Sequence, residues 1–410
     1  MRINIDRLMS DIERYGTYGL DPKGGLTRPS FSEPDYQVRE LFMKELKEMG
    51  LAVYVDPIAN IWGRWSGEDT SKKSIVIGSH LDTVPNGGMF DGALGVLVAK
   101  EIMKTIIEHE VPLKHTLEIV SFTAEEPNDF NLSTMGSRTF TGKLTKEDLM
   151  TVTDSKGTKL KDAVEKAGGS LERLPIEKDD IAAFVELHIE QGKQLESAEL
   201  PVGVVDRIVG IYRDKVTIIG ESNHSGTTMM NDRFDALTAA SEMILAVETI
   251  LRNHGTDAVA TIGKLDVFPN AANIIPGKVD MVLEIRSGTA AERIELKKMI
   301  YQKWDEVIDR RKVSINVVNI LDQQECQFDE QIVQWIQESA KDLQIPYTTF
   351  SSMAGHDATH MADVAKTAMI FVKSINGKSH CPEEFSKKED IEQAANVMLN
   401  AVLNIDQKLS

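Results

Sequence analysis

Residues 78–95 read GSHLDTVPNGGMFDGALG, and this stretch decides both the fold and the chemistry of the chain. It follows the β-branched run 75–77, which is short and apolar on both faces, as expected of a buried parallel strand. After Asp91, apolar residues recur at helical spacing as far as residue 109. The stretch therefore places the imidazole of His80 and the carboxylates of Asp82 and Asp91 between the end of a strand and the start of a helix.

His80 and Asp82 lie two residues apart, so in an extended chain their side chains project to the same side. The carboxylate of Asp82 can then orient the imidazole through one ring nitrogen and leave the other nitrogen for a metal ion. Asp91 lies close to the same strand end, at the expected start of the helix. We therefore expect the beginning of a metal site here.

A second apolar strand, expected over residues 116–123, is followed at once by Glu125-Glu126-Pro127. Proline disfavours a helical conformation in the residue before it, so the two glutamates are expected on an extended or turning segment. Neighbouring side chains on such a segment point in different directions. One carboxylate can then bind a metal ion while the other acts as a general base on water.

Two further histidines are expected near the carboxyl ends of strands. His188 lies near the end of a strand expected within residues 183–192, and His380 follows a strand at 367–372 through a loop that contains glycine. Open α/β sheets usually build their sites at this edge. Together with His80, Asp91 and Glu126 these histidines give five ligands, enough for two metal ions that share one carboxylate.

The pattern of elements predicts an α/β protein in two parts. Residues 1–205 and 326–410 alternate apolar strands with amphipathic helices, which is typical of a mixed sheet flanked by helices. Residues 206–325 instead follow the order βαββαβ, which is typical of a small ferredoxin-like domain with a four-stranded antiparallel sheet. The second part is expected to be inserted into the first.

Composition excludes several classes of protein. The 410 residues carry a formal net charge of −18 and contain no basic stripe, so we expect no nucleic-acid partner. No apolar run approaches the ~18 residues of a membrane-spanning helix, so no membrane partner is expected either. The first sixteen residues are polar and the chain has only Cys326 and Cys381, so we expect no secretory signal, no disulfide framework and a cytoplasmic protein.

Seven motifs then resemble, in the right order and spacing from about residue 16 to about residue 401, a known family of metal-dependent hydrolases. The family comprises N-carbamoyl-L-amino acid hydrolases, β-ureidopropionases and allantoate amidohydrolases, within the dinuclear zinc aminoacylase and dipeptidase superfamily. The motifs are GSHLDTVPNGGMFDGALGV (78–96), FTAEEPNDF (122–130), ELHIEQG (186–192), NHSGTTMMNDRFDAL (223–237), NIIPGKVDMVLEIRS (273–287), GHDA (355–358) and SHCPEE (379–384).

The resemblance implies a role for each matching residue. The expected metal ligands are His80, Asp91, Glu126, His188 and His380, with Asp91 bridging two divalent ions, Zn²⁺ first and Mn²⁺, Co²⁺ or Ni²⁺ as alternatives. The expected catalytic residues are Glu125 as general base, Asp82, and His224, which would polarise the scissile carbonyl. The expected substrate-binding residues are Gln191, His224, Asn273, Arg286 and Gly355, with Arg286 gripping a carboxylate.

The family also implies that the inserted part serves as a lid and as the interface of a homodimer. The substrate implied is a small anionic ureido compound, and the leading expectation is hydrolysis of N-carbamoyl-L-amino acids to the amino acid, CO₂ and ammonia. Allantoate amidohydrolase is the alternative. Residues 127–130 (PNDF), beside the site, depart from the Gly-Ser-Arg-Phe more usual there, and this departure leaves the exact substrate open. A dipeptidase or aminoacylase is a weaker alternative, against which His188 and Arg286 count, and a non-catalytic scaffold does not suit so complete a set.

Overall fold

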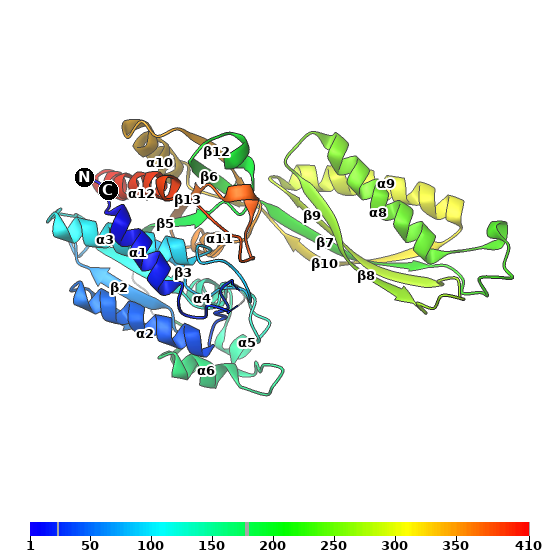
Figure 1. Cartoon of the computed structure of the whole chain (residues 1–410), viewed down its shortest axis with the longest axis horizontal. Helices are drawn as coiled ribbons and strands as arrows, with labels where there is room; N and C mark the ends of the chain where they lie inside the picture. Colours follow the sequence, from blue (N-terminus) through cyan, green and yellow to red (C-terminus); the bar gives the residue numbers. More distant parts are fainter. Residues whose placement is uncertain (23, 177–179, 410) are drawn as a thin grey trace. The chain divides into compact units, whose positions relative to one another are not determined.

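Four parallel strands form the centre of a nine-stranded sheet in the computed structural model, which describes residues 1–22, 24–176 and 180–409. The strand order is β1-β2-β4-β3-β5-β13-β6-β11, and β12 pairs with β6 (Figure 1). Strands β4, β3, β5 and β13 are mutually parallel, whereas the pairs β1–β2, β2–β4 and β6–β13 are antiparallel. The strands are β1 Ala52–Val55, β2 Ile61–Trp65, β3 Ser74–His80, β4 Leu117–Phe122, β5 Ile181–Ile189, β6 Val202–Ile208, β11 Cys326–Gln327, β12 Tyr347–Ser352 and β13 Lys366–Val372.

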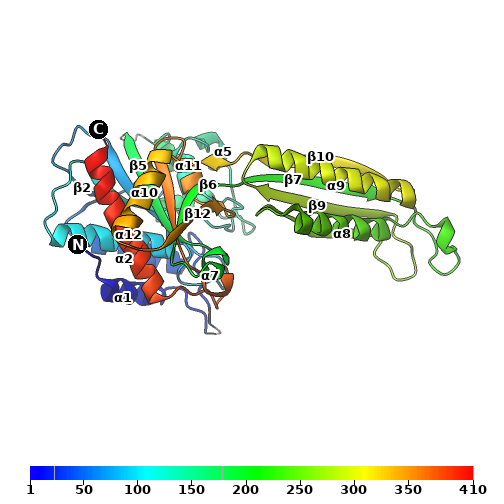
Figure 2. The same ribbon diagram turned by 90° about the horizontal axis from the view of Figure 1, so that it is seen from above.

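Helices cover this sheet and form a layer of their own. The helices α1, α3 and α12 pack on one another, α3 and α12 contact the central strands, and α2 lies against β1 and β2. Figure 2 shows α10 lying beside α12. The α-helices are α1 Ile5–Tyr15, α2 Glu33–Glu48, α3 Ala93–Glu108, α4 Met135–Phe140, α5 Lys146–Met150, α6 Leu160–Lys166, α7 Gln194–Ser197, α10 Glu330–Asp342, α11 Ala358–Met361 and α12 Lys388–Lys408. Short 3₁₀ turns occur at Leu171–Arg173 and Ile375–Gly377.

The burial of β3 and α3 explains why the deciding stretch folds as it does. Every residue of β3 is buried, as is every residue of β4. Their apolar runs therefore suit strands that are covered on both faces of the sheet. Between them in the chain, α3 is buried along most of its length, including Leu94, Val98 and Ile102. The loop from β3 to α3 is therefore anchored at both ends, which fixes the residues it carries.

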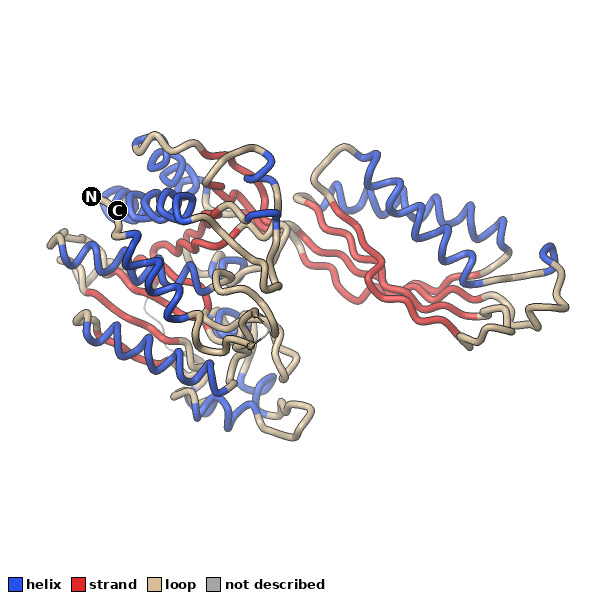
Figure 3. The backbone as a smooth tube through the Cα atoms, viewed as in Figure 1, coloured by secondary structure: helices blue, strands red, loops and turns tan. Residues whose placement is uncertain are grey.

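A second sheet of four antiparallel strands belongs to residues Arg207–Cys326, which form a compact unit separate from the rest of the chain. Its strands are β7 Gly210–Ile219, β8 Val259–Phe268, β9 Lys278–Ser287 and β10 Ser314–Gln323, in the order β10-β7-β9-β8. Its helices are α8 Ala236–His254 and α9 Ala290–Arg311, with a short 3₁₀ turn at Met230–Asp232 (Figure 3). This is the order βαββαβ and the ferredoxin-like arrangement that the sequence predicts.

Alternation along β9 gives the small sheet one covered face. Val279, Met281, Leu283 and Ile285 are buried and pack in one apolar cluster with residues of α8 and α9. The intervening residues, including Arg286, project from the other face. Side chains that bind a ligand can therefore be carried on that face without disturbing the core.

The predicted fold class is confirmed, with a mixed α/β sheet and a separate four-stranded antiparallel sheet. The units divide at Asp206/Arg207 and Cys326/Gln327, one residue beyond the boundaries expected from the sequence. The apolar pattern of the sequence did not predict the antiparallel strands β1, β2 and β6 or the strand β12, because each is short or lies toward the margin of the sheet. Within the three described ranges, no helix combines the length and apolar character needed to cross a membrane.

The core of the small unit yields a test of stability. Trp304 on α9 is fully buried, and its indole Nε1 donates to the carbonyl of Met243 at 3.0 Å. Trp304→Ala should lower the free energy of unfolding by about 3–5 kcal/mol, because it leaves a large cavity and removes a buried hydrogen bond. Ile294→Ala on the same helix is the matched control, since Ile294 is largely exposed and its loss should change little. Denaturant unfolding checks this, and equal effects of the two substitutions would contradict the packing described.

Candidate metal and active site

The carboxyl ends of the four parallel strands bring the expected site residues to one edge of the large sheet. Strand β3 ends at His80, β4 is followed by the Glu125-Glu126 pair, β5 carries His188 next to its last residue, and β13 leads into the loop of His380. In the register of β3 with β5, Ile77 lies opposite Val185, and each of these residues comes three positions before a histidine. The ring centroids of His80 and His188 are 5.9 Å apart. Parallel pairing thus assembles residues that are 300 positions apart in sequence.

The two strand histidines are oriented by main-chain carbonyls. Nδ1 of His80 lies 3.0 Å from the carbonyl oxygen of Asp82, and Nδ1 of His188 lies 3.0 Å from that of Ile189. A carbonyl only accepts, so each Nδ1 carries the hydrogen and each Nε2 keeps its lone pair. Both Nε2 atoms face the same carboxylate oxygen, Oδ1 of Asp91, at 3.6 Å for His80 and 3.3 Å for His188.

Asp91 is shared between two groups of potential ligands. While Oδ1 faces His80 and His188, Oδ2 lies 3.3 Å from Nε2 of His380, which in turn lies 3.3 Å from Oε1 of Glu126. Two sets of side chains therefore have ligand atoms within 4.8 Å of one another, His80/Asp91/His188 and Asp91/Glu126/His380. Asp91 is the member common to both, which is the position expected of a bridging ligand.

The turn that carries Asp91 requires glycine at position 92. Gly92 adopts φ +63°, and a Cβ there would lie 2.2–2.3 Å from ring atoms of His80. The imidazole therefore packs directly against the backbone at the start of α3. This close approach lets the carboxylate of Asp91 reach between the strand histidines.

The carboxylate of Asp82 binds the backbone of the two glutamates and also lies near the imidazole of His80. Its carboxylate accepts the backbone N–H of Glu126 at 3.1 Å and that of Glu125 at 3.4 Å, whereas Oδ1 is 3.6 Å from Nδ1 of His80. The closer partner of the imidazole is the main-chain carbonyl of the same residue. Asp82 therefore orders both the histidine and the turn after β4.

The glutamates face different directions, as the sequence predicts. Oε1 of Glu126 is buried and takes part in no hydrogen bond in the described part of the chain, although it faces His380. Oε2 of Glu125 lies 3.7 Å from Nε2 of His80. Burial raises the pKa of Glu125 well above its usual range, the charge of His80 opposes this rise, and the neighbouring carboxylates of Asp357 and Glu126 add to it.

The histidines and Asp91 stabilise one another electrostatically. Burial alone would raise the pKa of Asp91, but the facing imidazoles of His188, His380 and His80 lower it well below its usual range. Conversely, burial lowers the pKa of His80, yet the charge of Glu125 together with Asp82 and Asp91 raises it well above the ordinary value. The carboxylates of the site therefore stabilise positive charge that lies between them.

These residues fit divalent metal ions. Three imidazole nitrogens and two carboxylates converge, and both strand histidines turn Nε2 toward the shared carboxylate, while Nε2 of His188 also accepts the backbone N–H of Gly92 at 3.2 Å. Mixed nitrogen and oxygen ligands of this kind suit Zn²⁺ and its neighbours. The buried Oε1 of Glu126, which has no hydrogen-bond partner among the described residues, is the kind of atom that a metal ion satisfies. The structure is thus consistent with the dinuclear site predicted from the sequence.

Gln191 lies within this site, whereas Gly355 is at its margin. Nε2 of Gln191 donates to Oδ2 of Asp91 at 2.7 Å, and its Oε1 is buried with no partner among the described residues. Gln191 adopts φ +59°, which turns its side chain toward the ligands at the end of β5. Gly355 is exposed, and a Cβ there would meet no atom within 4 Å.

His224 and Asn273 are brought together in the small unit, and Arg286 is not near them. The backbone N–H of Ser225 donates to the carbonyl of Asn273 at 3.0 Å, and His224 forms an isolated bridge with Ile274. Asn273 comes just before β9 in the chain, and His224 pairs with the neighbouring Ile274. Arg286 lies near the other end of β9. The eight steps from 278 to 286 along β9 correspond to about 27 Å at ~3.4 Å per residue.

Arg286 belongs to a charged group on the open face of the small sheet. Its Nε donates to Oε1 of Glu284 at 2.7 Å, and Arg213 on β7 pairs with the other oxygen of the same carboxylate at 2.5 Å. Ile211, near the start of β7, lies opposite Arg286 in the sheet register. Arg286 is therefore at the end of the sheet where the chain enters this unit.

The sequence does not assign roles to His356 and Asp357 of the GHDA loop. In the structure this loop lies against His188. The ring of His356 stands edge-on to that of His188, with centroids 4.4 Å apart, and its Nε2 has no partner in the described ranges. Asp357 accepts a hydrogen bond from Ser137 and is fully buried, and burial together with the charge of Glu186 raises its pKa to about 8. From the sequence alone, His356 and Asp357 could equally support the metal ligands or be purely structural.

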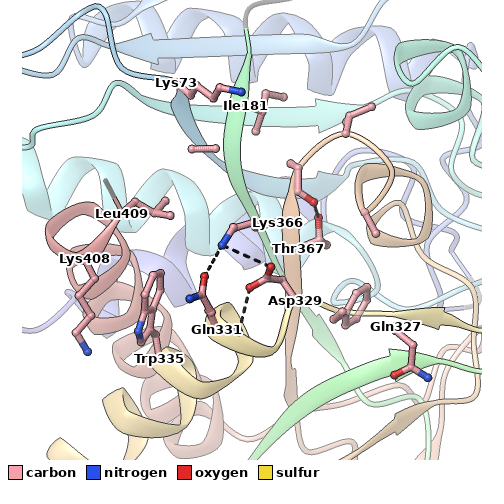
Figure 4. A pocket seen from close by; sticks show the side chains of 15 residues that line it. Lys73, Ile181, Gln327, Asp329, Gln331, Trp335, Lys366, Thr367, Lys408 and Leu409 are labelled. Carbon is pink, nitrogen blue, oxygen red and sulfur yellow. Dashed lines mark hydrogen bonds and ion pairs between the residues drawn. The ribbon is translucent and has the colours of Figure 1, made fainter.

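A surface cavity of about 690 Å³ lies at the opposite edge of the large sheet, where β5 and β13 begin (Figure 4). Trp335 and three lysines line it, but Lys366 contacts Asp329 and Gln331, as the dashed lines in Figure 4 show. The other two, Lys73 and Lys408, are paired with carboxylates at 3.1 Å and 2.6 Å. The described lining contains no histidine, so the cavity does not compete with the metal edge as the chemical centre.

Comparisons with known proteins agree with this geometry. The model of Peptidase family M20/M25/M40 matches residues 76–404. An N-carbamoyl-L-amino acid amidohydrolase from Geobacillus stearothermophilus is 37% identical over 408 residues, 99% of each chain, and an allantoate amidohydrolase from Escherichia coli (strain K12) is 34% identical over 386 residues, 93% of each chain. The crystal structure of an amidase of the hydantoinase/carbamoylase family from Burkholderia multivorans superposes with a TM-score of 0.92 at 32% identity, covering 98% of each chain.

The family resemblance expected from the sequence motifs is thereby confirmed along nearly the whole chain. The match extends over both the metal edge and the small unit, because the relatives are covered almost completely. The chain belongs to Peptidase family M20/M25/M40 and, within it, to the hydantoinase/carbamoylase group of hydrolases that act on C–N bonds.

Proposed function

We propose that this protein hydrolyses the carbamoyl C–N bond of N-carbamoyl-L-amino acids, releasing the amino acid, CO₂ and ammonia. The observation that carries the proposal is the shared carboxylate of Asp91, which joins two groups of metal ligands beside the buried carboxyl of Glu125. The names of the relatives support the ureido class of substrate. Their similar identities, 37% and 34%, keep allantoate as the second candidate.

His80, His188 and Asp91 would hold one divalent ion, and His380, Glu126 and Asp91 would hold the other. Zn²⁺ is the expected ion, and Mn²⁺, Co²⁺ or Ni²⁺ suit the same nitrogen and oxygen ligands. When bound, such ions lower the pKa of water and polarise a carbonyl oxygen. The remaining steps fall to side chains of the protein.

Glu125 is proposed as the residue that moves the proton. Its carboxylate takes a proton from the attacking water, whose oxygen forms a bond to the carbamoyl carbon. As the bond between the carbamoyl carbon and the amino-acid nitrogen breaks, Glu125 returns that proton to this nitrogen, and the carbamic acid left behind decomposes to CO₂ and ammonia. Burial, which raises the pKa of this carboxyl, allows it to hold the proton between the two steps.

The substrate is held by residues from both units in this proposal. The guanidinium of Arg286 grips the substrate carboxylate, a task that suits its planar pair of donors, and Glu284 fixes its Nε side. His224 donates to the oxygen of the scissile carbonyl, and Asn273 lies beside it through the Ser225 backbone bond. Gln191 and the exposed backbone of Gly355 complete the pocket from the large unit.

One copy of the small unit cannot present all three of its residues to one metal edge. His224 and Asn273 are separated from Arg286 by most of the length of β9, about 27 Å at ~3.4 Å per residue, which exceeds the length of a carbamoyl amino acid. We therefore propose a homodimer in which Arg286 comes from the chain that holds the ions and His224 with Asn273 come from its partner. The sequence and the family resemblance leave open whether these residues act within one chain or across a dimer, and this assignment is our proposal.

The substrate is tested by ammonia release from the metal-reconstituted protein. We expect turnover of carbamoyl-L-methionine and little or none of its D-enantiomer, which serves as the matched control. Carbamoyl-β-alanine, allantoate and a dipeptide complete the panel. Preferred turnover of allantoate would move the protein to the second candidate, and cleavage of the dipeptide alone would overturn the ureido proposal.

The base is tested by Glu125→Gln, which keeps the shape of the side chain but cannot accept the proton. We expect kcat to fall by about 10²–10⁴, the range typical of a lost general base, with the metal content unchanged. Asp129→Asn is the control, because Asp129 is exposed on the same loop. A Glu125→Gln protein that retained both its metal and near-normal kcat would exclude this role.

Sharing of residues across a dimer is tested by mixing two inactive variants, Arg286→Ala and His224→Ala, with subunit exchange. Random exchange makes half of the dimers mixed, and each mixed dimer holds one site with both residues intact, so about a quarter of wild-type activity should return. If both residues came from one chain, every site would lack one of them. Absence of recovery after demonstrated exchange would therefore contradict the arrangement.

A further inference from the structure

Glu384 is a buried carboxylate that neither the expected ligand set nor the proposed mechanism uses. It ends the SHCPEE motif four residues after His380 and is 5% exposed. Burial raises its pKa, and the nearby charge of Asp91 adds to the rise. A carboxylate so enclosed requires polar partners, and these partners identify what it does.

Its first oxygen holds the backbone of the Asp91 loop. Oε1 accepts the N–H of Phe90 and the N–H of Asp91, each at 3.0 Å. Two convergent N–H groups bound to one carboxylate oxygen fix the direction of the peptide between them, because each hydrogen bond must point along its N–H bond. The bridging aspartate is thereby set in place through its main chain.

Its second oxygen holds the side chain that contacts Asp91. Oε2 lies 3.0 Å from Oγ of Ser379, and the same Oγ lies 2.8 Å from Oδ2 of Asp91. The single hydroxyl hydrogen of Ser379 is shared between two carboxylates. A closed circuit of polar contacts thus runs from Glu384 through the backbone of Asp91 to its side chain and back through Ser379.

The neighbouring chain is shaped to admit Glu384. A Cβ at Gly88 would lie 2.2 Å from Oε1 of Glu384 and 2.4 Å from its Cβ, so only glycine fits at that position. Phe90 and Phe385 close the contact edge-to-face, with ring centroids 5.9 Å apart. The glycine at position 88 is therefore explained by the approach of the SHCPEE loop.

We propose that Glu384 is a positioning residue for the metal site, which rests on the ligand assignment proposed above. It locks the loop of His380 to the loop of Asp91, two loops that follow strands separated by β5 in the sheet. The second ligand group, Asp91/Glu126/His380, depends on this lock more than the first. His80 and His188 are carried on strands and are almost fully buried, whereas His380 stands in a loop with 48% of its side chain exposed.

The test is titration of the metal-stripped full-length protein with Co²⁺, followed by calorimetry and by the visible absorption of the ion. The wild type should bind two ions. Glu384→Ala should bind the second ion about 10–100-fold more weakly, the usual effect of losing a partner of metal ligands, while the first ion binds nearly as in the wild type. Glu383→Ala is the matched control, since Glu383 is exposed and pairs only loosely with Lys378 at 3.7 Å.

A conservative variant separates positioning from general stability. Glu384→Gln should restore both affinities, because its amide oxygen can accept both backbone N–H bonds and its amide nitrogen can donate to Ser379. Gly88→Ala should reproduce the loss seen in Glu384→Ala without removing any polar group, and it supports the test if Glu384→Ala does not fold.

Two results would overturn the inference: Glu384→Ala binding both ions as tightly as the wild type, or Glu384→Gln binding the second ion as weakly as Glu384→Ala. The second result would mean that negative charge, and not the pattern of hydrogen bonds, is what the site requires. A wild-type protein that bound only one ion would instead contradict the two-ion assignment of the proposed function, so the two failures are distinguishable.

Discussion

The carboxylate of Asp91 is the feature on which the rest of the site depends. It is buried, and both of its oxygens face imidazole nitrogens at 3.3–3.6 Å, so its charge has to be compensated by those rings or by ions held between them. Every neighbouring feature serves to keep it there. Gly92 lets the ring of His80 approach the backbone, Gln191 donates to Oδ2, and Glu384 ties down the main chain.

Much of this site could be predicted from the sequence because parallel strands end at a common edge. Once the buried strands before His80, Glu125 and His380 are recognised, the direction of the sheet brings their ends together without knowledge of the packing. Hydrophobic periodicity was equally sufficient for α3 and for the βαββαβ order of the small unit. The short antiparallel strands escaped prediction, since pairing at the margin of a sheet is decided by neighbours that are distant in the chain.

The contacts of Asp82 and Glu384 could not be predicted for a related reason. Both carboxylates bind backbone N–H groups of another loop, and a backbone N–H carries no sequence signal. The spacing of His80 and Asp82 indicated a direct side-chain contact, but the imidazole takes the main-chain carbonyl instead, and the carboxylate turns to Glu125 and Glu126. Residue identity therefore indicated which groups gather at the edge, and only the fold determined which atom meets which.

The length of strand β9 limits which residues of the small unit can reach the same small molecule. Alternation along β9 leaves its helix-free face available for charged side chains, so Arg286 and Glu284 can pair there without disturbing the core. The same rigid strand separates Arg286 from the His224–Asn273 corner by a distance that no rotamer change can bridge. A flexible loop could have brought these residues together, but a ten-residue strand within a four-stranded sheet cannot shorten. A site for one small molecule that used both ends of β9, as proposed above, would therefore need residues from more than one copy of this unit.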